Sequence, residues 1–142
     1  KYGSEIMIQK YIKGVEVTCG VLYDGKDETA LIPTEIVPPS ESFFDYKAKY
    51  TPGGSEEITP ARLSEDLLKE IQSISTKTHR LIGCKGFSRT DMIISDGNIY
   101  VLEINTIPGL TKTSLLPQGA EAAGISFSDL LNRIIKEAMS RN

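Results

Sequence analysis

The amino-acid sequence predicts an α+β fold, in which a mostly antiparallel sheet is packed with one long helix and two shorter carboxy-terminal helices. Three observations predict it. Apolar and polar residues alternate over residues 15–23, apolar residues recur at helical spacing over residues 65–82, and two β-rich runs flank a turn at residues 95–97. The chain has 142 residues, which suits one domain with a single core.

Composition and charge narrow the possible partners. The net charge is −3 and the basic residues are spread along the chain, so we expect no nucleic-acid partner. Cys19 and Cys84 form neither a CxxC pair nor a disulfide framework, a usage typical of buried thiols in a reducing cytosol, so we expect a cytoplasmic protein. No apolar run approaches the roughly 20 residues that cross a bilayer, and we expect no membrane partner.

Residues 15–23 are predicted to form a half-buried strand, which a turn at Asp24 and Gly25 closes. A second strand is predicted over residues 30–37, where Pro33 is tolerated only at a sheet edge or a bulge. The two strands are expected to pair as an antiparallel hairpin.

Residues 40–60 are predicted to form a long loop that folds over a site. The segment is rich in Ser, Gly and Pro and is too long for a plain connection, and such loops are usually functional or disordered. Its four aromatic side chains argue against disorder: Phe43, Phe44, Tyr46 and Tyr50. We interpret the segment as a lid, the alternative being a surface loop with a few anchored aromatic residues.

The long helix is predicted to begin after the N-cap Ser64 and to end at Gly83, whose left-handed conformation terminates helices. His79 lies on this helix and is expected at the surface or its boundary, without a functional role. Seven residues at helical spacing are expected to face the sheet: Leu67, Leu68, Ile71, Ile74, Thr78, Leu81 and Ile82.

Two shorter helices are predicted near the carboxy terminus. The first follows Ser114 and ends near Ala123, and the second begins with a capping box formed by Ser126 and Asp129. Four residues of the final helix are expected to face inward: Leu130, Ile134, Ile135 and Ala138.

The register of the hairpin around residues 95–97 decides which side chains share a face, because a shift by one residue inverts every side chain. A three-residue turn there, with its glycine in the left-handed region, sets Ile94 opposite Asn98. A two-residue turn would instead put Asp91 and Glu103 on opposite faces of the sheet.

The predicted register places four polar side chains on one face: Arg89, Asp91, Glu103 and Asn105. Arg89 then faces Glu103, Asp91 faces Val101, and the two acids are diagonal neighbours about 7–8 Å apart. Two carboxylates and an amide oxygen suit Mg²⁺, which prefers oxygen ligands. The alternative is a solvated face with an ion pair between Arg89 and Glu103, but apolar neighbours on both faces indicate buried charges that need compensation.

Three motifs recur in one known family. They are FDYKAKY at residues 44–50, GFSRTD at residues 86–91, and LEINTIPGLT at residues 102–111 with Ser114 following. Taken together they resemble the signature of the D-alanine–D-alanine ligases, within the ATP-grasp superfamily. The resemblance covers essentially the whole chain from IQKYI at residues 8–12 onward, and it implies the carboxy-terminal half of an ATP-grasp fold.

The resemblance implies a metal centre and a phosphoryl-transfer site. Asp91, Glu103 and Asn105 would hold two Mg²⁺ ions, for which Mn²⁺ substitutes, between the β- and γ-phosphates of ATP. Arg89 would stabilise the tetrahedral intermediate, since its planar cation bridges developing oxyanion charge.

The resemblance also implies an adenosine site. Its strand would read adenine through residues that the family aligns beside the base: Gln9, Lys10, Tyr11 and Ile12. Glu16 would bind the ribose hydroxyls. The family commonly has Glu at the position of Gln9, whose amide oxygen still accepts a hydrogen bond but without charge assistance.

In the family's mobile lid, Lys49 would meet the phosphates and Tyr50 would join a network near the first substrate, while closure protects an acyl phosphate from water. Gly109 and Ser114 would form the pocket for the carboxylate of the second D-alanine. Phe44 stands where some relatives have Tyr. Without the resemblance, Gly109 and Ser114 read as an ordinary turn with an N-cap.

By resemblance, the intact enzyme would use ATP to phosphorylate one D-alanine, which the amine of a second D-alanine then attacks, for peptidoglycan synthesis. The chain begins with Lys1 and residues 5–12 look like an element entering a sheet, so we expect an inactive fragment (residues 1–142) of a homodimeric enzyme. The alternatives are a ligase using D-lactate or D-serine, and a non-catalytic nucleotide-binding module.

Overall fold

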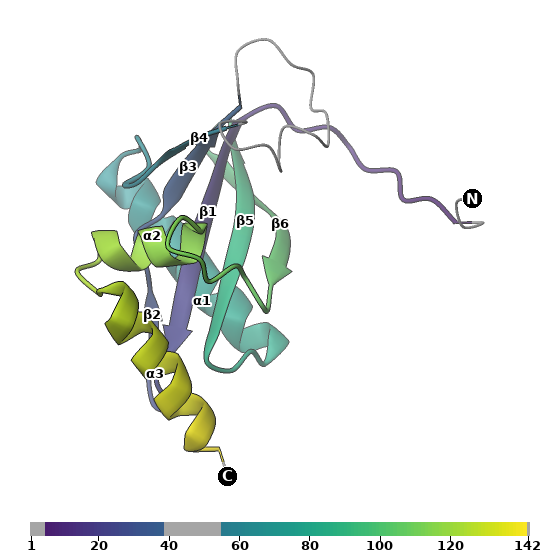
Figure 1. Cartoon of the computed structure of the whole chain (residues 1–142). Coiled ribbons are helices and arrows are strands. Elements are labelled where there is room, and N and C mark those ends of the chain that lie inside the picture. The colour runs from purple at the N-terminus through teal and green to yellow at the C-terminus, as the bar shows by residue number, and fades with distance from the viewer. Residues whose placement is uncertain (1–4, 39–54, 142) are drawn as a thin grey trace.

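The computed structural model describes residues 5–38 and 55–141 (Figure 1). Within them, a six-stranded antiparallel sheet has the order β4-β3-β1-β5-β6, and β2 pairs with β1 beside β3. The strands are β1 (Val15–Tyr23), β2 (Glu28–Ala30), β3 (Thr34–Val37), β4 (Glu56–Ile58), β5 (Phe87–Ser95) and β6 (Asn98–Asn105). The helices are α1 (Glu65–Ile82), α2 (Leu115–Ala122) and α3 (Phe127–Met139). The predicted α+β class is therefore confirmed.

Strand β1 is central because its alternating side chains feed two separate cores. Val17 and Cys19 are buried against Ile71 of α1 on one face of the sheet. On the other face, Leu22 belongs to a cluster that includes Leu116 of α2. Figure 1 shows α2 and α3 on the near face of the sheet and α1 behind it.

The predicted second strand is wrong as a continuous element. It is divided into β2 and β3, and both pieces pair with β1 on the same side. Pro33 lies in the break, where its missing N–H removes no sheet hydrogen bond. Leu31 is fully buried in the break, and its N–H donates to the oxygen of Gly20 at 2.8 Å. The predicted antiparallel pairing with β1 is confirmed for both pieces.

Helix α1 has the predicted ends. The Ser64 hydroxyl accepts a hydrogen bond from the N–H of Leu67 at 3.4 Å, and Gly83 follows the last turn with φ of 74°. Two of the residues expected to face the sheet are instead exposed: 75 % of Leu81 and 60 % of Ile82. The buried stripe passes through Ile71, Ser75 and His79, which lie four residues apart.

The carboxy-terminal helices also have the predicted starts, and Ser126 accepts from the N–H of Asp129 at 3.2 Å. Of the residues expected to face inward, Leu130 is buried, but Ile135 and Ala138 are exposed. Glu137 occupies part of the buried face, and its carboxylate pairs with Arg141. The paired carboxylate of Glu137 therefore lies on the buried face of α3, where the apolar spacing predicted Ile135 and Ala138.

Residues 5–13 do not form the expected element of a sheet. They have no regular secondary structure, and Figure 1 shows this segment leading away from the body of the domain. None of the described helices is both long and apolar enough to span a membrane.

The two cysteines are free thiols. Cys19 is 1 % exposed, and burial raises the pKa of its thiol to about 12. Cys84 is half-buried. The thiol of Cys19 is therefore protonated and acts as an apolar core group.

His79 is buried, which corrects its expected surface position. Its side chain is 1 % exposed, and its Nδ1 lies 2.7 Å from the hydroxyl of Ser88 on β5. Burial lowers the pKa of His79, because the imidazolium loses its hydration. The neutral ring thus joins α1 to the strand that carries Arg89 and Asp91.

We predict that this histidine makes the domain acid-sensitive. The unfolded chain binds a proton near pH 6.5, whereas folded His79 resists protonation to lower pH. Stability therefore falls as the pH drops from about 6.5 toward the folded pKa, by at most about 1.4 kcal/mol per pH unit for one proton. Urea unfolding at pH 7.5 and 5.5 should show a larger loss for the wild type than for His79→Gln. An equal loss in both proteins would contradict the prediction.

Candidate active site

The turn between β5 and β6 has two residues, not the predicted three. Ser95 lies opposite Asn98, and the turn residues Asp96 and Gly97 have φ of 51° and 75°. Two consecutive left-handed residues are typical of a type I′ turn, whose twist matches that of the flanking strands. The three-residue turn and its register are therefore wrong.

A β-bulge restores the shared face that this short turn would have destroyed. Met92 pairs with Val101 but Asp91 pairs with Glu103, so Leu102 is the extra residue. Asp91 therefore lies directly opposite Glu103 and not opposite Val101. The same shift puts Arg89 opposite Asn105, not opposite Glu103.

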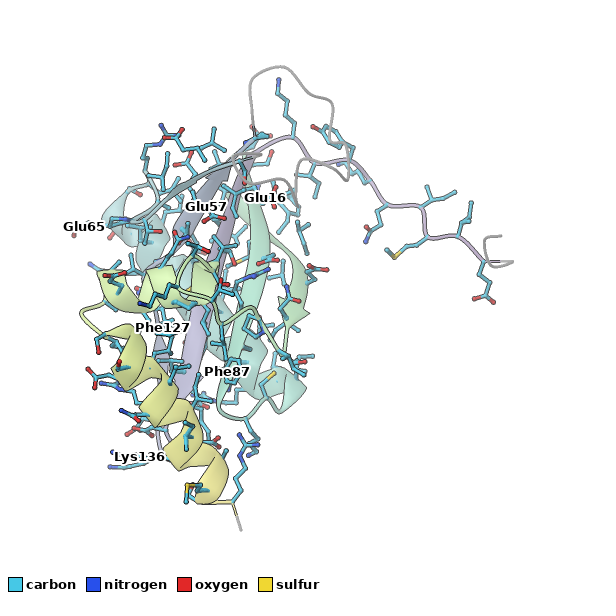
Figure 2. The ribbon with its side chains drawn as sticks, in the orientation of Figure 1. Glu16, Glu57, Glu65, Phe87, Phe127 and Lys136 are labelled. Atoms are coloured by element: carbon cyan, nitrogen blue, oxygen red, sulfur yellow. The ribbon has the colours of Figure 1, made fainter. Side chains whose placement is uncertain are left out.

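The four predicted side chains line one pocket of about 360 Å³. Its remaining walls come from β1, β3, β4 and the chain leading into α2, and Figure 2 shows Glu16 and Glu57 at this end of the sheet. The lining residues used below are Glu16, Thr18, Glu57, Arg89, Asp91, Glu103, Asn105 and Gly109. We call this the carboxylate pocket. The expectation that the four residues share a face is confirmed, although their pairing differs.

Asp91 is the hub of the carboxylate pocket. Arg89 donates from Nε and Nη2 to its two oxygens at 2.9 and 2.8 Å. The Thr18 hydroxyl on β1 donates to Oδ1 at 2.6 Å, and Asn105 Nδ2 on β6 donates to Oδ2 at 3.4 Å. One carboxylate therefore binds groups from three adjacent strands.

Arg89 is a half-buried cation whose charge is held by neighbouring acids. Its side chain is only 18 % exposed. Burial acts to lower the pKa of Arg89, but the hydrogen bonds and charge of Asp91, and the charges of Glu103 and Glu57, outweigh burial and raise it. The ion pair considered from the sequence, Arg89 with Glu103, is replaced by the two-point pair with Asp91.

The donor set of the pocket suits a hard cation. Asp91, Glu103 and Asn105 offer carboxylate and amide oxygens, and Asn105 turns its nitrogen to Asp91, which leaves its oxygen on the other side of the amide. Among the described residues, no three His, Cys, Asp or Glu side chains are grouped to hold a metal ion. A cation would therefore depend on the amide and on oxygens from a bound ligand as well as on the two acids.

Gly109 and Ser114 are brought together at the start of α2. A Cβ built on Gly109 would lie 2.8 Å from the Ser114 hydroxyl, which is too close for a side chain at this position unless Ser114 shifts. The hydroxyl does not cap α2; it accepts from the N–H of Thr111 at 3.1 Å and lies 2.7 Å from the Thr111 hydroxyl. The N-terminal backbone of α2 next to Gly109 resembles sites where proteins hold anions.

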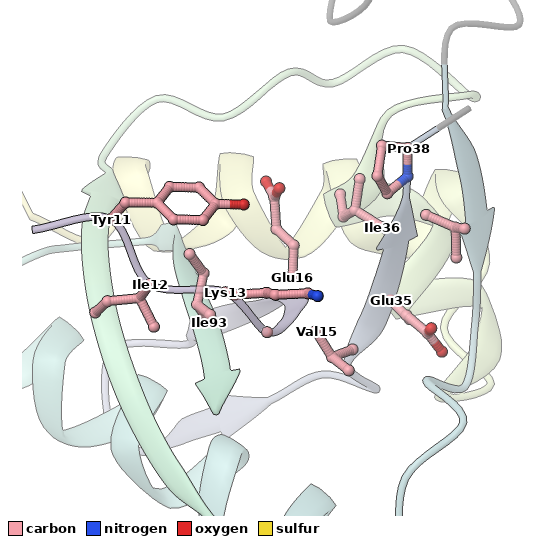
Figure 3. Close-up of a pocket in the computed structure, with 11 residues that line it drawn as sticks. Tyr11, Ile12, Lys13, Val15, Glu16, Glu35, Ile36, Pro38 and Ile93 are labelled. Atoms are coloured by element: carbon pink, nitrogen blue, oxygen red, sulfur yellow. The ribbon is translucent and has the colours of Figure 1, made fainter. Parts of the chain in front are cut away.

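A second pocket of about 330 Å³ adjoins the first and shares Glu16 with it. Figure 3 shows the Tyr11 ring and the Glu16 carboxylate facing the same space, with Ile36 and Pro38 across from Tyr11. Ile12 also lines this pocket. Gln9 and Lys10 do not, since their segment leads away from it and both residues are exposed. Only part of the predicted adenosine site is thus assembled.

Glu35 is a lining residue that the sequence analysis missed. It is 8 % exposed, and Arg62 donates to its oxygens from Nε at 2.9 Å and from Nη2 at 2.7 Å. These hydrogen bonds lower the pKa of Glu35, so the carboxylate stays ionised. Thr18 and Glu57 were missed as well, because single strand residues carry no signal of what lies across the sheet.

Lys49 and Tyr50, the predicted lid residues, lie outside the described residues. Their roles stay predictions.

A family described as "D-ala D-ala ligase C-terminus" matches residues 1–136. The chain belongs to this family. The D-alanine–D-alanine ligase of Syntrophobacter fumaroxidans is 52 % identical over 141 residues, which are 98 % of this chain and 45 % of that protein. The chain thus spans less than half the length of this relative.

Two solved ligase structures are similar in fold to this chain. A Bacillus anthracis D-alanine–D-alanine ligase complexed with ATP has a TM-score of 0.75 and 36 % identity, covering 93 % of this chain and 40 % of that one. The VanG D-Ala:D-Ser ligase of Enterococcus faecalis has a TM-score of 0.74 and 37 % identity, covering 89 % and 36 %. The fold is therefore that of the carboxy-terminal half of an ATP-grasp ligase.

We predict that the hydrogen bond from Thr18 to Asp91 stabilises the folded domain. Thr18→Val keeps the shape of the side chain but removes the donor to Asp91, and it should lower the free energy of unfolding by about 1 kcal/mol. Thr29→Val, at the exposed residue of β2, is the control, with a change within about 0.5 kcal/mol. Urea unfolding measures both. Equal values for the two variants would show that the Thr18 bond contributes nothing.

Proposed function

We propose that the protein containing this domain is an ATP-dependent ligase that joins two D-alanines through an acyl phosphate. The observation that carries the proposal is the carboxylate pocket, where a half-buried cation, two acids and an amide converge. The ligases that the chain resembles, one of them complexed with ATP, support the substrate assignment. The reaction would supply a peptidoglycan precursor from the cytoplasm, and the expected homodimer stays a prediction.

Asp91, Glu103 and Asn105 are the proposed ligands of two Mg²⁺ ions, with Mn²⁺ as a substitute. When bound, such ions neutralise the charge of the transferred phosphoryl group. The fit rests on the oxygen donors of the three residues and on their shared pocket. For Asp91 to bind a cation, it would have to exchange at least one of its present hydrogen-bond donors.

Arg89 is the proposed stabiliser of oxyanion charge. Its Nε and Nη2 bind Asp91, and its Nη1 end is not part of this pair. A guanidinium held rigidly at two points costs little reorganisation when charge develops next to it. Asp91 would thus orient the guanidinium of Arg89 and also bind a metal ion.

The proposed roles of the remaining groups follow the family resemblance. Tyr11, Ile12 and Glu16 would contact the nucleoside, with Glu16 on the ribose hydroxyls. Gln9 and Lys10 stay proposals that require this segment to approach the pocket. Gly109 and Ser114 would hold the carboxylate of the second D-alanine beside the backbone at the start of α2. Lys49 and Tyr50 would act on the phosphates and near the first substrate.

We predict that Asp91→Asn and Glu103→Gln, made in the intact protein, abolish D-alanine-dependent ADP release. Loss of a metal ligand removes several kcal/mol of charge stabilisation, equivalent to more than about 100-fold in rate. Glu70→Gln, an exposed residue on α1, is the control and should keep full activity. A thermal melt checks that each variant folds. Full activity in folded Asp91→Asn would rule out Asp91 as an essential metal ligand, whereas no ADP release by the wild type would favour a non-catalytic nucleotide-binding module.

A ligase that takes D-serine second is the other candidate, because the D-Ala:D-Ser ligase shares the fold at 37 % identity. We predict that adding D-serine or D-lactate to limiting D-alanine does not raise ADP release above the release with D-alanine alone. Product analysis by mass spectrometry identifies the dipeptide. A mixed product as the main species would move the protein to that branch while leaving the metal role intact.

A further inference from the structure

A side-chain bridge joins β4 to α2 at the wall of the carboxylate pocket. Gln118 Nε2 donates to Glu57 Oε2 at 2.5 Å and to the backbone oxygen of Thr113 at 3.0 Å. Glu57 lies on β4, and Gln118 lies in the first turn of α2. One amide group thus connects an edge of the sheet, a helix and the loop before that helix. We call this the Glu57–Gln118 bridge.

The bridge fixes the loop that carries Ser114 and Gly109. Gln118 holds the carbonyl of Thr113 through its side chain, and its own N–H donates to the oxygen of Ser114 at 3.1 Å. Two consecutive carbonyls of the loop are therefore bound by one residue. The Ser114 hydroxyl is then directed toward Thr111 and Gly109 and not toward the helix it precedes.

The bridge also restrains a charge beside Arg89. Glu57 lines the same pocket as Arg89, and its charge helps to raise the pKa of that guanidinium. Its Oε2 is held by Gln118, a neutral donor. A Glu57 side chain without this restraint would be able to turn toward Arg89, where it would compete with Asp91 for the cation.

Strand β4 gives Glu57 its position. It has three residues and pairs with β3, where Glu57 lies opposite Ile36, another lining residue of the pocket. A strand this short makes few backbone hydrogen bonds, so these bonds alone attach it only weakly to the edge of the sheet. The link to α2 therefore sets the distance between two walls of the pocket.

We propose that the Glu57–Gln118 bridge is a positioning device for the second substrate, an amino acid whose carboxylate binds beside Gly109 and Ser114. Gln118 sets the conformation of the loop, and Glu57 anchors it to the sheet. Neither residue touches the reacting atoms. The inference rests on the proposed ligase function and adds two residues that have no assigned role in it.

The test compares variants of the intact protein in D-alanine-dependent ADP release. Gln118→Met keeps the length of the side chain but removes both donors, and the apparent KM for the second D-alanine should rise by about threefold to tenfold, the value of one or two hydrogen bonds. The KM for ATP and kcat should stay within about twofold, since neither the phosphates nor the reacting atoms are touched. Glu57→Gln keeps an acceptor for Gln118, so the KM for the second D-alanine should stay within about twofold of the wild-type value.

Glu57→Ala removes the acceptor and should raise the same KM, whereas Glu56→Ala, its exposed neighbour on β4, should not. The double variant Gln118→Met/Glu57→Ala should be no worse than Gln118→Met, because both changes break one bridge. An additive double variant, or a fall in kcat with KM unchanged, would overturn the proposal.

Hydrogen exchange separates this inference from the proposed function. Amides of residues 109–118 should exchange faster in Gln118→Met than in the wild type, while those of β5 should not change. If the wild type shows no D-alanine-dependent turnover, the ligase proposal fails, and unchanged exchange at residues 109–118 would separately overturn the bridge.

Discussion

The hydrogen bonds of the Asp91 carboxylate organise the open face of this domain. They join β1, β5 and β6 through Thr18, Arg89 and Asn105, so the three strands meet at one carboxylate. This side chain is 16 % exposed, and a carboxylate withdrawn from water needs hydrogen-bond donors around it. The same donors that stabilise the charge also set the direction of the Arg89 guanidinium. The structural and proposed chemical roles of the pocket therefore rest on one group.

One face of the sheet carries the main core, and the other carries the pocket. α1 covers one face with a continuous core, and His79 and Ser88 extend the contact to β5. α2 and α3 cover only part of the other face, around Leu22 and Leu116. The uncovered part is where the polar side chains of β1, β4, β5 and β6 line the pocket. A site can be polar and accessible here because the opposite face and the covered half supply the stability.

In the hairpin, the expected shared face of Asp91 and Glu103 is confirmed, although the expected turn is wrong. The convergence of Asp91 and Glu103 was expected from an odd turn, yet the turn is even and Leu102 supplies the missing residue as a bulge. Both arrangements give the same parity, and side-chain facing depends on parity alone. The donor chemistry at this face was thus predictable, whereas the partners were not: Arg89 pairs with its own strand neighbour Asp91 and not across the hairpin.

What the sequence determined by itself is local. The position of β1 and the caps at Ser64 and Gly83 depend on neighbours along the chain, and these predictions agree with the structure. The expectation that β1 is half-buried is wrong, since residues 17–22 are all buried. Only the tertiary structure decided the break at Pro33, the bulge at Leu102 and the burial of His79. Each of these depends on a partner in another element: β1 for the divided strand, Asp91 on β5 for the bulge, and Ser88 on β5 for the histidine. Periodicity along one segment carries no information about which side chains another segment brings to it.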